Sequence, residues 1–237
     1  MHVRRFACIP FLLVAMCALA AAQQHRGGMS RAGSDLDSAD VIDWRQLRRS
    51  DFVGERPPGA FGTSHVRPVA VSCAYVIVAP EARIFPVPVA DAEADVAFQA
   101  RIEGLAFQAL LSRSCSWWNP DNTVSPAYVL QHEQIHFDLF ETTARRLNRD
   151  VPGLLHVMDV RGPTVDAVVD IAQKYVQTAL SRALNKTGAL SQKFDLETSF
   201  GIQPQRQNGW RVRLDRDLKE LEPYVVPGPA VPAAPVE

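Results

Sequence analysis

Clusters of apolar and β-branched residues predict strands in the first half of the chain. The segment 69–78 is rich in β-branched residues and predicts one strand. The segment 83–89 predicts a second. Pro86 and Pro88 place that strand at the edge of a sheet, because proline has no N–H to donate to a neighbouring strand.

An alternation of apolar and polar side chains over 98–103 predicts a third strand. Glu103-Gly104 could turn the chain into a fourth strand over 105–111. A helix over 92–111 is the alternative, because alanine and leucine, which favour helices, are plentiful there. The pattern alone leaves both possibilities open.

The strongest helical pattern begins at Ser125-Pro126, where a good N-cap residue precedes a proline suited to the first turn. Apolar residues then recur at helical spacing as far as Leu147. Pro152-Gly153 is expected to end this helix, since proline cannot continue the hydrogen-bond pattern.

A second helix is predicted over 164–184, with Thr164 as its N-cap and Gly188 closing it. A short charged helix is predicted over 214–221. Together these elements predict an α+β domain. Its small, mostly antiparallel sheet is backed by the first helix, and the second helix packs against them.

Both ends of the chain are expected to lie outside this domain. A basic start and an apolar run ending in small residues predict a secretory signal peptide over 1–22, with an uncleaved anchor as the alternative. A polar leader follows over 23–40. The domain spans 41–224, and 225–237 is a tail rich in proline and alanine.

Composition adds little to this picture. The chain has 237 residues, of which 47% are hydrophobic, enough for one sizeable core. Its formal net charge of −1 gives no reason to expect nucleic acid or an anionic membrane surface as partner. No stable membrane span is expected once the signal peptide is removed.

The number of cysteines is relevant to whether the protein folds in an oxidising compartment. Cys8 and Cys17 belong to the predicted signal, which leaves Cys73 and Cys115. An exported protein meets oxidising conditions, which would allow these two to form a disulfide. Two separate buried thiols are the alternative, since the sequence does not give the distance between their Cα atoms.

Candidate chemistry lies in the first predicted helix, at His132-Glu133-Gln134-Ile135-His136. In this H-E-x-x-H motif the histidines at i and i+4 project from one face, so both can reach a single Zn²⁺. Glu133 is turned about 100° from His132, where it can take a proton from water without binding the ion. Core histidines with satisfied hydrogen bonds are the alternative interpretation.

A zinc site of this kind needs a third protein ligand. Asp138 and Glu141 face away from the two histidines on the predicted helix, which makes them structural partners. The third ligand is therefore expected from another part of the chain. Four distant candidates offer suitable atoms: Asp195, Glu197, His156 and His65.

At these residues the chain resembles a bacterial family, the predicted secreted zinc-dependent proteases. The family hallmark, H-E-Q-G-H-F-D followed by a glutamate, corresponds to 132–138 and Glu141. A second motif, Tyr-Asp-x-x-Thr-x-His-Gly, corresponds to 194–201. Shorter correspondences are a glutamine and a tryptophan at Gln205 and Trp210, an earlier tryptophan at Trp44, Asp51-Phe52-Val53-Gly54, and Ser116-Trp117.

The resemblance implies a minimal zincin-like fold and an exported zinc metallopeptidase. Such an enzyme would hydrolyse peptide or protein substrates in the periplasm or outside the cell. His132 and His136 would bind Zn²⁺, and Glu133 would act as the general base. The chain departs from the family at Ile135, which replaces a glycine, and at Phe200, which replaces a histidine.

Asp195 is the preferred third ligand, and a turn residue bonding its own backbone is the alternative. The replacement at Phe200 motivates a second functional hypothesis, a non-catalytic zinc-binding structural or interaction protein of the cell envelope. A third hypothesis is a metal-free interaction domain in which the two motif histidines belong to the core.

Overall fold

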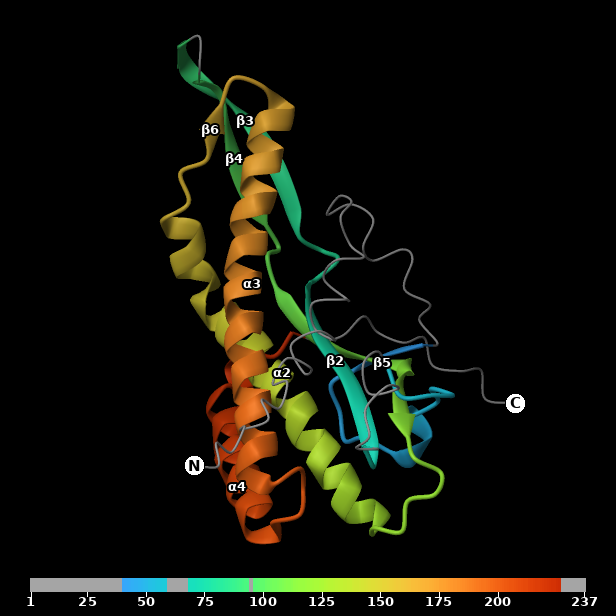
Figure 1. Cartoon of the computed structure of the whole chain (residues 1–237). Helices are drawn as coiled ribbons and strands as arrows, with labels where there is room; N and C mark the ends of the chain where they lie inside the picture. Colours follow the sequence, from blue (N-terminus) through green and yellow to red (C-terminus); the bar gives the residue numbers. More distant parts are fainter. Residues whose placement is uncertain (1–39, 59–67, 94–95, 227–237) are drawn as a thin grey trace, which may run out of the picture.

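The computed structural model describes residues 40–58, 68–93 and 96–226 (Figure 1). The predicted signal peptide, almost all of the leader and most of the tail lie outside these ranges. The described residues form an α+β fold with three long helices and two small antiparallel sheets. No helix among them is both long and apolar enough to cross a membrane.

The first sheet has the strand order β1-β5-β2. Its strands are β1 at Val41–Asp43, β2 at Ala70–Val78 and β5 at Phe107–Trp118, all paired antiparallel. Helix α2, at Pro126–His156, packs against β2 and β5 and buries the main apolar core between helix and sheet.

The second sheet has the order β3-β4-β6, with β3 at Arg83–Glu93, β4 at Val96–Glu103 and β6 at Arg161–Gly162. Its pairings are also antiparallel. β3 is an edge strand, as Pro86 and Pro88 predict, because these prolines need no hydrogen-bonding partner on the outer side.

Helices α3, at Val165–Thr198, and α4, at Pro204–Glu220, complete the fold. α3 begins beside the second sheet and runs along α2 almost to the opposite end of the molecule (Figure 1). α4 follows a tight turn and contacts both α2 and α3. Short 3₁₀ helices lie at Arg49–Asp51 and Glu222–Tyr224.

The strands predicted over 69–78, 83–89 and 98–103 are confirmed, but they are divided between two sheets rather than one. The alternative of a helix over 92–111 is wrong. Gly104, with a left-handed φ of 63°, separates β4 from β5.

The predicted end of the first long helix is wrong, because α2 passes through Pro152 and ends at His156. Two contacts explain why this last turn persists. Val151 and Leu155 pack against the main core, and the Tyr175 hydroxyl donates to the carbonyl of Leu154 at 3.1 Å. Tertiary packing therefore outweighs the local cost of the proline.

The predicted end of the second helix and the start of the third are also wrong. α3 continues through Gly188 because the side chains beyond it face α2, and the Thr187 and Thr143 hydroxyls lie 2.6 Å apart. α4 begins at Pro204 rather than at 214. Its longer course is stabilised by a buried stripe of four side chains at helical spacing: Gln207, Trp210, Leu214 and Leu218.

Cys73 of β2 and Cys115 of β5 form a disulfide, with their Cα atoms 5.7 Å apart. The bond crosses the first sheet next to an irregularity in the β2–β5 register between Val71 and Cys73. It encloses a long loop, since the two residues are 42 positions apart. A covalent link of this kind restricts the unfolded chain and so stabilises the folded one.

Replacing both cysteines by serine is expected to lower the free energy of unfolding by about 2–4 kcal/mol, because the unfolded chain regains its freedom. Urea unfolding without reductant, followed by circular dichroism, measures this change. The wild-type protein in dithiothreitol is the control and should match the double variant. Equal midpoints for the oxidised wild type and the double variant would contradict the prediction.

Candidate metal centre

His132 and His136 of α2 meet Asp195 of α3, and together these side chains form a candidate metal centre. The Nε2 atoms of the two histidines lie 3.3 Å apart. Asp195 Oδ1 lies 3.3 Å from Nε2 of His132 and 3.1 Å from Nε2 of His136. Three potential ligand atoms thus face a common point from two helices.

The second nitrogen of each imidazole is held by a neighbouring side chain. Nδ1 of His132 lies 3.1 Å from Oε1 of Gln207, which belongs to α4. Nδ1 of His136 lies 2.8 Å from the hydroxyl oxygen of Ser191, on α3. Outer partners of this kind orient metal-binding histidines and select the tautomer that leaves Nε2 free.

The orientation of the Gln207 amide settles the tautomer of His132. Gln207 is fully buried, and its Nε2 donates to the Tyr128 carbonyl at 3.2 Å and to Oε1 of Gln131 at 2.9 Å. Its Oε1 must therefore accept from His132, so the proton lies on Nδ1. The lone pair of His132 Nε2 is then directed to the candidate metal position.

An apolar cluster supports the two imidazoles from behind. The Phe194 ring centroid lies 4.5 Å from that of His132 and 5.0 Å from that of His136. Phe194 packs in turn with Ile135 and Trp210, and all three are buried. Ile135, one of the two departures from the family pattern, therefore fills the contact between α2 and α4.

The charges at this centre depend on one another. Burial opposes the ionised form of Asp195, but the charges and hydrogen bonds of His136 and His132 hold the pKa of its carboxyl well below the usual range. Burial likewise opposes a charged His136, yet Asp195 and, more weakly, Glu133 raise its pKa. The centre thus attracts positive charge, supplied either by a proton or by a metal ion.

Glu133 lies between the motif histidines along the helix and is 4% exposed. Its carboxylate is near enough to His136 to favour the charged form of that imidazole. Within the described part of the chain, no hydrogen bond engages this carboxylate. It is therefore free to accept a proton from a water molecule at the centre.

The other proposed third ligands do not reach this centre. The Glu197 carboxylate accepts from Trp210 Nε1 at 2.9 Å and pairs with Lys193 at 3.8 Å. His156 is exposed at the far end of α2, about 30 Å along the helix axis from His136. His65 lies outside the described residues.

The side chains of Gln134 and Asp138 lie on the face of α2 opposite the two histidines. Gln134 Oε1 accepts from the backbone N–H of Leu47 at 2.7 Å, and Asp138 accepts from Trp44 Nε1 at 2.7 Å and pairs with Arg211. A cavity of about 640 Å³ lies beside these residues. They attach the segment after β1 to α2 and are not part of the candidate metal centre.

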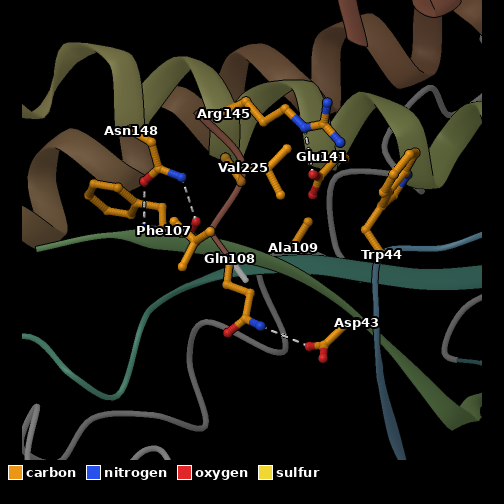
Figure 2. Close-up of a pocket in the computed structure, with 11 residues that line it drawn as sticks. Asp43, Trp44, Phe107, Gln108, Ala109, Glu141, Arg145, Asn148 and Val225 are labelled. Carbon is orange, nitrogen blue, oxygen red and sulfur yellow. Dashed lines mark hydrogen bonds and ion pairs between the residues drawn. The ribbon is translucent and has the colours of Figure 1, made fainter. Parts of the chain in front are cut away.

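Glu141 is structural as well, in a smaller cavity of about 130 Å³ that is shown in Figure 2. It accepts from Arg145 at 2.7 Å, and the Arg145 guanidinium lies over the Trp44 ring at 4.8 Å. Burial raises the pKa of Glu141 despite this ion pair. Asn148 closes one end of the cavity by bonding both the N–H and the carbonyl of Phe107.

Gln207 and Ser191 belong to the centre although neither is part of the H-E-x-x-H motif. Replacing Gln207 by Met is expected to weaken metal binding about 10–100-fold, because His132 loses the partner that fixes its tautomer. A competition titration of zinc against a chromophoric chelator measures the affinity. Gln203→Met is the matched control on the exposed side of the same turn, and an equal loss there would contradict a specific role for Gln207.

Comparison with known proteins gives no guide to this centre. No protein-family model, curated protein or solved structure matches the chain. The role of the centre has to be inferred from its own residues and their geometry.

Proposed function

We propose that this protein is an exported zinc-dependent metallopeptidase that hydrolyses peptide bonds in peptide or protein substrates. The observation that carries the proposal is the convergence of His132 Nε2, His136 Nε2 and Asp195 Oδ1 at mutual distances of 3.1–3.3 Å. With both imidazoles neutral and unprotonated at Nε2, three acceptor atoms held this close repel one another, and a metal cation between them would relieve that repulsion.

The donor set fits zinc in particular. Zinc bound tetrahedrally at 2.0–2.1 Å would hold its ligand atoms about 3.3 Å apart, close to the spacing of these three. Two imidazoles and one carboxylate also match the three protein ligands of catalytic zinc sites, which keep a fourth position open. Gln207 and Ser191 supply the outer partners that such a site requires.

When bound, zinc would supply a Lewis acid that acidifies water and polarises a carbonyl group. Glu133 would accept the proton of the attacking water and pass it to the leaving amine. Its burial without a hydrogen-bonding partner among the described residues suits this role. Phe194, packed behind the histidines, limits the access of bulk water to their rings.

Two further features support an exported peptidase. The Cys73–Cys115 disulfide is expected in an oxidising compartment, which agrees with the predicted signal peptide over 1–22. The H-E-x-x-H helix and the segment 194–201 resemble the predicted secreted zinc-dependent proteases, and a minimal zincin-like arrangement follows from that resemblance. Asp195, the preferred third ligand, belongs to the second of these motifs.

The test is the zinc content of the purified protein by elemental mass spectrometry, with His132→Ala and His156→Ala as a matched pair. We expect about one zinc per chain in the wild type and in His156→Ala, and none in His132→Ala, because His132 lies at the centre and His156 does not. Absence of zinc from the reconstituted wild type would overturn the proposal and leave the two histidines as core residues.

A second candidate function is a zinc-binding structural or interaction protein of the cell envelope. Phe200, where the family has histidine, favours it, because an imidazole beside the centre would otherwise be available for catalysis. This candidate predicts bound zinc with no hydrolysis of any peptide. Zinc content together with peptide hydrolysis therefore separates the two functions.

A further inference from the structure

Three exposed apolar side chains surround the turn that leads from α3 to α4, next to the metal centre. Leu196 follows the candidate ligand Asp195, and Phe200 and Ile202 flank Gly201. These side chains are 51%, 69% and 78% exposed.

Gly201 fixes the position of this turn relative to the centre. A Cβ atom at Gly201 would lie 3.3 Å from Nδ1 of His132, so the backbone here runs against the imidazole. The Tyr128 hydroxyl, from the first turn of α2, donates to the Gly201 carbonyl at 2.6 Å. Phe200 and Ile202 are therefore direct chain neighbours of a residue in contact with a candidate metal ligand.

The end of α3 explains why Phe200 remains exposed. Ser199 has a left-handed φ of 50°, and the N–H groups of Ser199 and Phe200 donate to the carbonyls of Leu196 and Asp195. In such a helix end the second residue outside the helix ordinarily packs on an apolar residue of the last turn. Here that position is occupied by Asp195, whose side chain faces the histidines, so Phe200 has no apolar partner there.

Polar side chains between Leu196 and Gln203 are already engaged by neighbouring groups. Gln203 Nε2 donates to the Ser199 hydroxyl at 2.8 Å, and the Glu197 carboxylate is held by Trp210 and Lys193. The segment presents three apolar side chains to solvent beside the Glu197–Lys193 ion pair. An exposed apolar group of this kind next to a reactive centre suits an apolar ligand.

We propose that Leu196, Phe200 and Ile202 form an apolar subsite that receives an apolar side chain of the peptide substrate. This inference rests on the proposed peptidase function and names its substrate class. Phe200 would then help to determine substrate specificity. The histidine at the corresponding position of the family pattern would instead offer an imidazole for hydrogen bonding or metal binding.

The test compares two internally quenched peptides of the same length that differ only in leucine or serine at the variable positions. We expect the wild type to favour the leucine peptide about tenfold or more in kcat/KM. The double variant Phe200→Ser, Ile202→Ser should lose most of this preference, and Phe200→Leu should retain it. Val212→Ser, an apolar position on α4 that is 61% exposed, is the matched control and should behave as the wild type.

Peptide binding to zinc-loaded Glu133→Gln, measured by fluorescence anisotropy, tests the subsite without turnover. A leucine preference that the double variant loses supports the subsite, even if no peptide is cleaved and the peptidase proposal fails. If the protein cleaves or binds both peptides without distinguishing leucine from serine, the subsite is overturned. The peptidase proposal is not affected by that result. If no form of the protein binds or cleaves either peptide, both the subsite and the peptidase proposal are overturned.

Discussion

Replacement of Glu133 by Gln is expected to lower kcat about 10²–10⁴-fold, the usual contribution of a general base. Glutamine has nearly the same shape but cannot accept the proton of the attacking water. The candidate ligands His132, His136 and Asp195 remain in place, so zinc should still be bound. Peptide hydrolysis and zinc content, measured on the same preparation, check both parts of this expectation.

The matched control is Glu220→Gln, a glutamate at the exposed end of α4. It should hydrolyse peptides at the wild-type rate. If Glu133→Gln retained full activity with zinc bound, another group would have to be the base. If Glu133→Gln lost both zinc and activity, Glu133 would be required for the integrity of the centre instead.

Replacement of Asp195 by Asn is expected to weaken zinc binding by more than about a hundredfold, since outer partners alone contribute 10–100-fold. The change removes the negative charge that the two imidazoles face, while the amide keeps the size of the side chain. A chelator-competition titration measures the affinity. Asp215→Asn, an exposed aspartate on α4, is the control and should bind zinc as the wild type does.

The same variant tests the electrostatics of the metal-free centre. Burial opposes the charge on His136, but Asp195 outweighs burial and raises the pKa of that imidazole. This charge stabilises the chelated protein fully below about pH 6.5, the ordinary histidine value. The stabilisation is lost as the pH rises through the raised pKa of the folded state.

Zinc reverses this dependence, because it binds the neutral imidazoles and competes with protons. The difference in Tm between zinc-loaded and chelated wild type should therefore widen from about pH 6 to pH 8. The stability of chelated Asp195→Asn should no longer fall as the pH rises through this range. Added zinc should change the Tm of this variant little. A wild-type difference that narrows with rising pH would contradict binding at this centre.

The sequence predicted the parts of the fold and site that depend on local patterns. The spacing of His132 and His136 within one helix follows from the 3.6-residue period, and the edge position of β3 follows from its prolines. Pro152 and Gly188 misled the prediction, since each interrupts a helix locally while packing against other elements maintains it. Because α3 continues past Gly188, Asp195 lies on a helix rather than in a turn.

Gln207 illustrates what local patterns leave out. It lies 75 residues from His132 in the sequence, and only the packing of α4 against α2 brings the two together. A signal was nevertheless present, because Gln207 occupies the apolar stripe of α4 with Trp210, Leu214 and Leu218. A buried amide in such a stripe needs hydrogen-bonding partners, which suggests a polar site on the facing helix.

The two cross-links available to this chain enclose consecutive stretches of sequence. The disulfide joins residues 42 positions apart in the strands, and a metal at the centre would join His136 to Asp195, 59 positions apart in the helices. Neither loop contains any part of the other, so closing one leaves the length of the other unchanged. The strand half and the helical half can therefore be tied down in either order during folding, and a reductant and a chelator would loosen different halves of the molecule.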